Sequence, residues 1–350
     1  MKDMTIIDIA RLAGVSVSTV SRVLNKHSDV SAATKAKIGA IIAEHGYVPN
    51  VSARSLKCES TKAIGVVIKG FTNPVFTAML EIVHQEIERN GYMLLLAQVD
   101  PNQDEVDAAI ALCKERKPRG LIFMGGNFRH ARGKLAMLDA PYVMLTITLD
   151  NEVDRAAFSS VTVDDYAAGW SIAEKIYAAG HRKVMIMGAS AGDLSISRLR
   201  EDGFVKGLAA HGLVLGEERI AYSGSFTYKN SYETARALLK RIEFTCLFCV
   251  SDIQALGAMR AIHDAGFSVP QDISVIGFDG IEEGQYHIPS LATLRQPVAQ
   301  MANAGVRALL NHIRSGAPHE HLLFTPEFFA GESFAPRSGA VLEGCYTISG

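Results

Sequence analysis

Acidic, amide, guanidinium and aromatic side chains follow the predicted strands of residues 63–340 and form a set suited to binding a small polar ligand. Asp252 comes directly after one short apolar run and Asp279 ends another, while Arg200 lies between two runs. Carboxylates accept hydrogen bonds from neighbouring hydroxyl groups, arginine donates several from a fixed fork, and an aromatic ring covers the C–H face of a sugar. Arginine also suits a carboxylate, so the chemistry fits a sugar or a sugar acid. The structural alternative is that Asp252 and Asp279 only cap the helices that follow them.

The sequence has none of the familiar arrangements for covalent catalysis, nucleotide binding or a metal site. It contains no His-Glu-x-x-His helix and no recognisable Ser–His–Asp arrangement. Glycine clusters at 124–127 and 187–192 match neither Gly-x-Gly-x-x-Gly nor a phosphate-binding loop, so we interpret them as turns after strands. Cys246 and Cys249 are three residues apart on a predicted strand, which turns their sulfurs to opposite faces. We therefore expect no enzyme activity, no cofactor and no metal ion.

A second group of side chains, in residues 5–25, suits the reading of DNA. Thr5 and Asp8 have the spacing of a capping box, and apolar residues at helical spacing follow as far as Gly14, which predicts a short helix ended by glycine. Ser16 begins a second helix whose apolar and polar residues separate onto two faces. Two short helices joined by a glycine-containing turn predict a helix-turn-helix, and the second helix has the outward chemistry of a major-groove reader.

A third helix and a short linker complete this N-terminal region. Ser31 has the position of a cap for a helix that ends near 45–46, and Pro49 stops what precedes it. Residues 51–56 can form only one or two helical turns, too few for a stable isolated helix. Since this segment carries Arg54 and is followed by a lysine, we interpret it as a hinge that orders on a partner.

These residues closely resemble the DNA-binding headpiece of the lactose/galactose repressor (LacI/GalR) family. The motifs that carry the resemblance are Asp-Ile-Ala-Arg-Leu-Ala-Gly-Val-Ser at 8–16, Thr-Val-Ser-Arg-Val-Leu-Asn at 19–25, Gly-Tyr-Val-Pro-Asn at 46–50 and Ala-Arg-Ser-Leu at 53–56. Further motifs of the family follow in order at 61–66, 180–183, 273–279 and 289–294. The resemblance therefore covers nearly the whole chain, and it implies a ligand-responsive, DNA-binding transcriptional regulator, in this family commonly a repressor.

For DNA binding, the resemblance implies a homodimer in which two headpieces bind the half-sites of a pseudo-palindromic operator in double-stranded DNA. It assigns base contacts to Val17, Ser18 and Arg22, and the arginine suits a bidentate contact with guanine. It assigns phosphate contacts or helix caps to Thr5, Ser16, Thr19, Ser21 and Asn25. The hinge residues assigned to the DNA are Asn50, Ala53, Leu56 and Lys57. Leu56 matches the apolar residue that the family wedges into the minor groove at the operator centre.

For the ligand, the resemblance implies an effector whose binding changes the angle between two lobes and so the spacing of the paired hinges. Induction by a sugar is the commoner arrangement in the family. The residues that match the family's effector contacts are Phe76, Arg200, Phe226, Asp252, Asp279 and Gln296, to which we add Asn73 and Asp164.

The charge distribution fits a DNA-binding head on an acidic body. Residues 1–62 hold nine Lys and Arg against five Asp and Glu, although the whole chain holds 35 against 37. Hydrophobic residues make up 48% of the 350 residues, enough for more than one core. No apolar run approaches the roughly 20 residues of a membrane span, and no signal peptide is recognisable, so we expect a cytoplasmic, nucleoid-associated protein.

Residues 63–340 alternate short apolar runs with amphipathic ones, which predicts parallel sheets flanked by helices. The resemblance implies two flavodoxin-like lobes, similar to periplasmic sugar-binding proteins, behind an all-α headpiece and a hinge helix. The expected segments are the headpiece at 1–49, the hinge and linker at 50–62, a first lobe at 63–161 with 293–320, a second lobe at 162–292 with 321–340, and a tail at 341–350.

Two other functions fit part of the sequence. A sugar-binding protein without a transcriptional role would share the two-lobed body, and an α/β enzyme acting on sugars would use the acidic residues as catalysts. The basic head argues against both, and no paired nucleophile and base supports the enzyme. Residues 335–350 lack the leucine heptad of the family's tetrameric members, so we expect a dimer.

Overall fold

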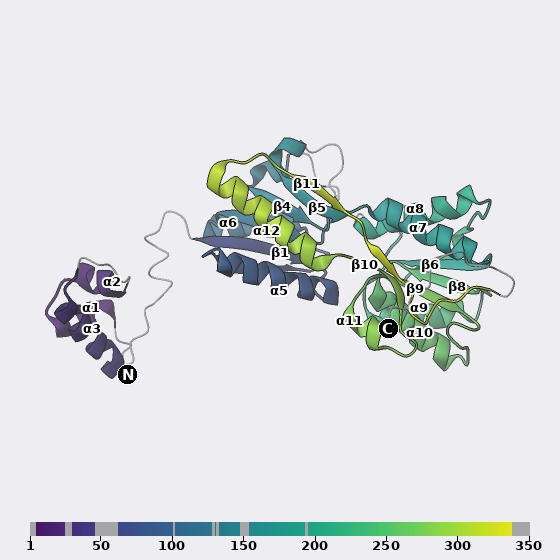
Figure 1. The fold of residues 1–350 in the computed structure, drawn as a ribbon, viewed down its shortest axis with the longest axis horizontal. Coiled ribbons are helices and arrows are strands. Elements are labelled where there is room, and N and C mark those ends of the chain that lie inside the picture. Colours follow the sequence, from purple (N-terminus) through teal and green to yellow (C-terminus); the bar gives the residue numbers. More distant parts are fainter. Residues whose placement is uncertain are drawn as a thin grey trace, which may run out of the picture. The chain divides into compact units, whose positions relative to one another are not determined.

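The computed structural model describes residues 5–24, 30–45, 62–100, 102–127, 130, 133–147, 154–192 and 195–337. The chain divides into two compact units, at 1–61 and 62–350. Figure 1 shows the helices of the first unit in purple and the α/β second unit in blue to yellow. Among the described helices, none combines the length and the apolar character that crossing a membrane requires.

In the described part of the first unit, at 5–24 and 30–45, three helices form a bundle around a small apolar core. Its helices are α1 (Ile6–Ala13), α2 (Val17–Leu24) and α3 (Ala32–His45). The buried side chains at its centre are Ile9, Ala10, Ala13, Val20 and Ile38. Each helix therefore contributes one apolar stripe to the core, as the helical spacing of these residues predicts.

The caps predicted around the first turn are confirmed. Thr5 Oγ1 accepts a hydrogen bond from the Asp8 backbone N–H at 3.3 Å, and Asp8 Oδ2 accepts one from the Thr5 N–H at 3.0 Å. Gly14 ends α1 at φ 66°, a left-handed conformation that favours glycine. Ser16 Oγ accepts from the Thr19 N–H at 3.2 Å and so caps α2. These local interactions fix the turn between the two helices.

The first lobe of the second unit is a six-stranded parallel sheet in the order β11-β5-β4-β3-β1-β2. Its strands are β1 (Ala63–Lys69), β2 (Met93–Val99), β3 (Gly120–Met124), β4 (Tyr142–Leu145), β5 (Ser159–Val163) and β11 (His321–Phe324). Its helices are α5 (Pro74–Arg89), α6 (Glu105–Arg116) and α12 (Val298–Ser315), with short turns η1 (Leu135–Met137) and η2 (Arg155–Ala157). Residues of α5 and α12 share one buried cluster, whereas α6 packs into another, so helices cover both faces of the sheet.

The second lobe is a six-stranded sheet in the order β12-β10-β9-β8-β6-β7, parallel except for the edge strand β12. Its strands are β6 (Val184–Gly188), β7 (Ile220–Tyr222), β8 (Cys246–Cys249), β9 (Ser274–Asp279), β10 (Ala292–Arg295) and β12 (Glu327–Phe329). Its helices are α7 (Asp165–Ala178), α8 (Ile196–Ala210), α9 (Tyr228–Leu238), α10 (Asp252–Asp264) and α11 (Glu282–Tyr286), with the short turn η3 (Glu217–Arg219). Helices α7 and α8 pack on one face and α9 and α10 on the other.

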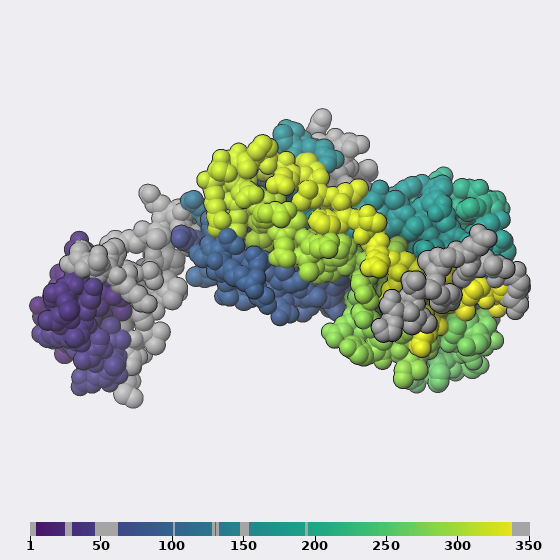
Figure 2. Space-filling model, in the orientation of Figure 1, coloured from purple at the N-terminus to yellow at the C-terminus, as the bar shows by residue number. Residues whose placement is uncertain are grey.

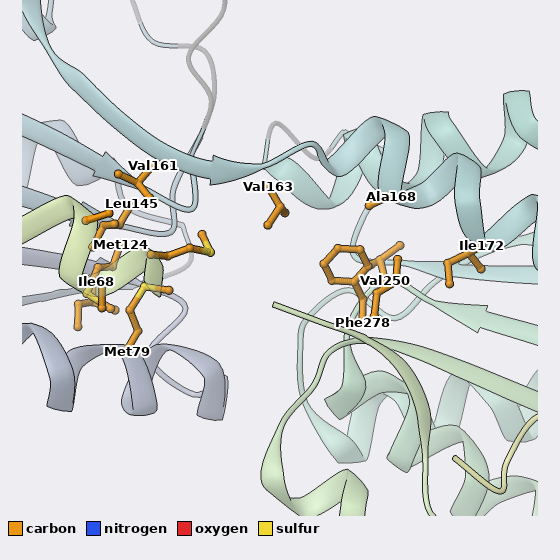
Figure 3. Packing of buried hydrophobic residues seen from close by; sticks show 14 of the residues in the cluster. Ile68, Met79, Met124, Leu145, Val161, Val163, Ala168, Ile172, Val250 and Phe278 are labelled. Atoms are coloured by element: carbon orange, nitrogen blue, oxygen red, sulfur yellow. The ribbon is translucent and has the colours of Figure 1, made fainter. Parts of the chain in front are cut away.

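One apolar cluster extends through both lobes. In the first lobe it contains Ile68 of β1 and Met79 of α5, and in the second it contains Phe278 of β9. Figure 3 shows Val163, at the end of β5, between these two groups, where the chain passes from one lobe to the other. The carboxyl ends of β1 and β9 face each other across the two lobes, because Asn73, shortly after β1, donates a hydrogen bond to Asp279, the last residue of β9.

The two lobes with parallel sheets are as expected, but the expected boundaries at 293–320 and 321–340 need correction. β10 pairs with β9 in the second sheet, whereas β11 pairs with β5 in the first. The chain thus crosses between β10 and α12 and again between β11 and β12, and Figure 2 shows this segment in yellow on the surface of both lobes. Short apolar strands look alike in sequence, and only tertiary contacts decide which sheet each one joins.

Candidate nucleic-acid interface and ligand site

Helix α2 turns its predicted base-reading side chains away from the core of the headpiece. Val17 is 41% exposed, and Ser18 and Arg22 are exposed too, whereas Val20 is fully buried. The apolar face of α2 packs on the neighbouring helices. Its other face presents Val17, Ser18 and Arg22 to solvent, as expected of a helix that reads a major groove.

The hydroxyl residues assigned to phosphate contacts or caps form a local network around the two helix starts. Ser16 Oγ lies 2.7 Å from Ser18 Oγ and 2.9 Å from Thr19 Oγ1. Thr5 Oγ1 donates a hydrogen bond to an Asp8 carboxylate oxygen at 2.6 Å. The capping role is thus observed for Thr5 and Ser16, while Ser21 is half-buried on α2. The predicted DNA-binding residues that lie outside the described residues are Asn25, Asn50, Ala53, Leu56 and Lys57.

Four of the eight predicted effector residues meet between the two lobes. Asp279 accepts hydrogen bonds from Asn73 Nδ2 and from Gln296 Nε2, both at 2.8 Å. Arg200 Nη1 lies 3.3 Å from the Asp279 carboxylate. Asn73 also caps α5 in the first lobe, accepting from the Val75 N–H at 3.2 Å, so it joins a helix start of one lobe to a strand end of the other. The inter-lobe polar cluster, as we name it, consists of Asn73, Asp165, Arg200, Ser251, Asp279 and Gln296.

Asp165 belongs to this cluster, although it is not among the effector residues predicted from the sequence. Its Oδ1 accepts a hydrogen bond from Arg200 Nε at 2.8 Å, and its side chain is fully buried. The selected neighbour, Asp164, is exposed and caps α7 by accepting from the Ala167 N–H at 2.9 Å. The sequence does contain a signal that could have indicated Asp165. Two adjacent aspartates follow a strand, and only one of them is needed to cap the next helix, so the other is available for a different role.

Asp279 has an unusual backbone conformation that Asp252 helps to hold. Its φ of 121° lies in a region that residues other than glycine rarely adopt. Asp252 Oδ2 accepts from the N–H groups of Gly280 at 2.6 Å and Ile281 at 2.8 Å, and its Oδ1 accepts from the Thr293 hydroxyl at 2.7 Å. Both oxygens of Asp252 thus bind the protein itself. These contacts give Asp252 a structural role, although not the one that the sequence suggests, because its carboxylate binds the turn after β9 and Thr293 of β10 and does not cap α10.

The two predicted aromatic residues are half-buried at different places. Phe76 lies on α5 beside the turn after β3, and a Cβ added at Gly125 would come 3.0 Å from its ring. Phe226 follows β7 in the second lobe and packs against the large apolar cluster. Neither ring is part of the hydrogen-bonded network.

The electrostatics of the site are set by buried carboxylates around one buried guanidinium. Burial raises the pKa of Asp165 to about 6, in spite of the Arg200 charge, and the nearby Asp279 carboxylate adds to the rise. Burial likewise raises the pKa of Asp252 to about 7, with a further contribution from Asp279. Arg200 also donates to the Val250 carbonyl oxygen at 2.8 Å. The positive charge of Arg200 is therefore already matched by the ion pairs with Asp165 and Asp279.

Two buried acceptors of the cluster have no hydrogen-bond partner among the described residues. They are Asp165 Oδ2 and Gln296 Oε1. A buried acceptor without a partner costs free energy, so these atoms favour a ligand that donates hydrogen bonds. Two surface pockets of about 350 and 340 Å³ border α12 instead, at His312 and Arg307, and none of the predicted site residues lines them.

The described residues include no group of three His, Cys, Asp or Glu side chains placed to hold a metal ion. Cys246 and Cys249 are fully buried in β8, and burial raises the pKa of both thiols. A thiol kept protonated in this way is a poor nucleophile and a poor metal ligand. The geometry thus supports a structural role for both cysteines.

Known proteins resemble both units of this chain. Residues 5–50 match the family described as bacterial regulatory proteins, lacI family, and residues 173–334 match a periplasmic binding protein-like domain. The chain is 37% identical over 333 residues to the HTH-type transcriptional regulator MalR of Clostridium butyricum, across 94% of this chain and 99% of MalR. The chain belongs to the LacI family. It is also 33% identical over 315 residues to the HTH-type transcriptional repressor PurR of Serratia proteamaculans, across 89% of this chain and 91% of PurR.

Solved structures agree with this assignment over both units. The Lac repressor dimer bound to operator and the anti-inducer ONPF has a TM-score of 0.76 and 26% identity, across 95% of this chain and 99% of that chain. The complex of the transcriptional regulator CelR with cellobiose has a TM-score of 0.69 and 26% identity, across 95% and 100% of the two chains. This LacI-family member is therefore a DNA-binding transcriptional regulator with a helix-turn-helix headpiece and a two-lobed α/β core, as the sequence predicts.

Proposed function

We propose that this LacI-family regulator is a repressor whose affinity for a pseudo-palindromic operator falls when a neutral sugar binds between its two lobes. The observation that carries the proposal is the inter-lobe polar cluster, in which Asn73 of the first lobe donates directly to Asp279 of the second. A ligand whose hydroxyl groups reach Asp279 competes with this hydrogen bond. The ligand thereby favours a different angle between the two lobes. Through the hinges, this change alters the affinity for the operator.

The charges of the cluster favour a neutral ligand over an anion. Arg200 is already paired with Asp165 and Asp279, so the carboxylate of a sugar acid would meet an excess of negative charge in a buried site. The acceptors without partners, Asp165 Oδ2 and Gln296 Oε1, suit the hydroxyl donors of a sugar. Of the two effector classes that the sequence leaves open, the geometry supports the sugar.

The structural relatives support the assembly and the ligand class. The Lac repressor structure is a dimer on its operator, and the CelR structure is a complex with cellobiose. A homodimer of this chain would bring two copies of α2 to the two half-sites of an operator. The protein would then act in the cytoplasm, on DNA in the nucleoid, without an enzymatic step.

A thermal-shift panel tests the ligand class. The neutral probes are maltose, cellobiose and galactose, and the anionic probes are gluconate and glucose 6-phosphate. A ligand at a hundred times its Kd adds about 2.7 kcal/mol to the free energy of unfolding and raises Tm by a few degrees. We expect shifts from a neutral sugar only, and the same sugar should release the protein from operator DNA in a filter-binding assay. A shift from the anionic probes alone would contradict the proposal.

Two variants locate the binding site of that sugar. Asp279→Asn should abolish the shift, because the amide cannot accept with both of its terminal atoms. Glu282→Gln removes a negative charge from an exposed position three residues along the chain and should leave the shift unchanged. A full shift in Asp279→Asn would place the sugar elsewhere in the protein.

A further inference from the structure

A second direct contact between the lobes is made by the backbone. Asn127, in the turn after β3 of the first lobe, pairs with Ser195 of the second lobe in an isolated antiparallel bridge. Ser195 caps α8 by accepting from the Ser197 N–H at 3.3 Å. Since α8 also carries Arg200, the bridge joins the first lobe to the helix that supplies the guanidinium of the inter-lobe polar cluster.

The turn that carries Asn127 has a shape that depends on two glycines. Gly125 adopts φ 68° and Gly126 adopts φ 138°, both in the region that favours glycine. A Cβ on Gly125 would collide with the Lys69 carbonyl oxygen, and one on Gly126 would collide with the Glu105 carboxylate. From the sequence alone, this glycine cluster is interpreted as a turn after a strand. Its close packing instead gives Asn127 a defined position.

The side chain that holds this turn is Glu105, the first residue of α6. Its carboxylate is 1% exposed, and Oε1 accepts from the Asn127 N–H at 2.6 Å. Its Oε2 lies 3.1 Å from Lys69 Nζ, and His130 Nε2 lies 3.4 Å from Oε1. A buried carboxylate with a charge-assisted hydrogen bond and a cationic partner is a strong anchor, whereas the same group without them would be destabilising.

We propose that Glu105 is a positioning residue for lobe closure. It fixes the turn at 125–127, keeps the Asn127 backbone in register with Ser195, and so determines how long the two lobes stay together at this point. Glu105 acts through Asn127 and needs no contact with an effector. Its influence on the effector response rests on the proposed function, but its influence on the bridge does not.

Disulfide trapping measures the bridge directly. Opposed residues of antiparallel strands have Cα atoms about 5 Å apart, which is within the range that a disulfide spans. The reporter is the full-length protein with Asn127→Cys and Ser195→Cys, and the readout is the rate of disulfide formation under mild oxidation, followed by gel mobility. The single variant Asn127→Cys shows any reaction with the cysteines that the chain already has.

In this reporter, Glu105→Ala should slow disulfide formation about tenfold, because the Asn127 N–H loses a charged acceptor. Glu105→Gln should slow it about threefold, since the amide oxygen still accepts from Asn127 but no longer pairs with Lys69. The matched control is Glu115→Gln, an exposed position near the other end of α6, which should react at the rate of the unmodified reporter.

An unchanged rate in Glu105→Gln, or in a folded Glu105→Ala, would overturn the proposal. Circular dichroism identifies the folded variants, and the glutamine variant still decides the question if the alanine variant does not fold. The assay contains neither effector nor operator. A failure of the sugar-responsive repressor proposal would therefore leave its result intact, and the reverse also holds.

Discussion

At the scale of single residues, the adjacent Asp164 and Asp165 show how burial separates two identical side chains. Asp164 faces solvent and caps α7, whereas Asp165 is fully buried against Arg200. The sequence places both after a strand, where a cap is needed, but it does not reveal which of the two turns inward. Asp279 could be selected because it ends a motif that carries the family resemblance, and Arg200 because it matches an effector contact of the family. Asp165 has no such motif, and its role follows only from the contact with Arg200.

The raised pKa of Asp165 predicts a pH dependence of stability. In the unfolded chain this aspartate would lose its proton near its ordinary pKa of 3.8, whereas in the folded protein it keeps the proton to about pH 6. Protons therefore favour the folded state, and the free energy of unfolding should fall by up to about 3 kcal/mol as the pH rises from about 4 to about 6. Asp165→Asn cannot ionise and should lose this part of the pH dependence.

Urea denaturation between pH 4 and pH 7 measures the effect. The matched control is Asp164→Asn, which keeps a good capping residue at an exposed position and should follow the wild-type pH profile. Identical profiles for Asp165→Asn and the wild-type protein would show that the buried carboxyl group does not titrate in this range.

At the scale of elements, local features are predictable from sequence and long-range pairings are not. The capping box of Thr5 and Asp8 depends on residues three apart, and the structure confirms it. The sheet that β10 or β11 joins depends on partners far along the chain, so the expected lobe boundaries are displaced. The bridge made by the turn at 125–127 could not be predicted for the same reason, because its partner Ser195 lies in the other lobe.

Helix α2 provides the prediction for DNA recognition. Arg22 is exposed on the face of α2 opposite the buried Val20, where its guanidinium can make a bidentate contact with a guanine. Arg22→Ala should weaken specific operator binding by about 1–3 kcal/mol, roughly 5-fold to 150-fold, and relax selectivity at one base pair. Lys37→Ala removes the same charge from an exposed position on α3 and is the matched control. Fluorescence anisotropy with operator and scrambled duplexes measures both variants, and equal losses on the two duplexes would argue against a base contact.

At the scale of the whole molecule, the two units differ in net charge: the first is basic and the second is acidic. The N-terminal residues carry an excess of Lys and Arg over Asp and Glu, although the chain as a whole has a net charge of −2. The body has a buried polar cluster and a backbone bridge, and each of them joins its two lobes. A regulator built in this way can change its operator affinity only by as much as the ligand distinguishes the two lobe arrangements.

This division of charge predicts a steep salt dependence of operator binding. Each phosphate neutralised by a basic side chain releases a counterion, so the logarithm of the binding constant falls linearly with the logarithm of the salt concentration. A dimer with about six phosphate contacts should lose roughly 10³-fold in affinity between 50 and 200 mM salt. Sedimentation velocity and Tm at the same salt concentrations separate this loss from dissociation of the dimer and from unfolding. A flat dependence, with the dimer intact, would mean that the basic headpiece does not neutralise phosphates. The headpiece would then have to bind a partner other than DNA.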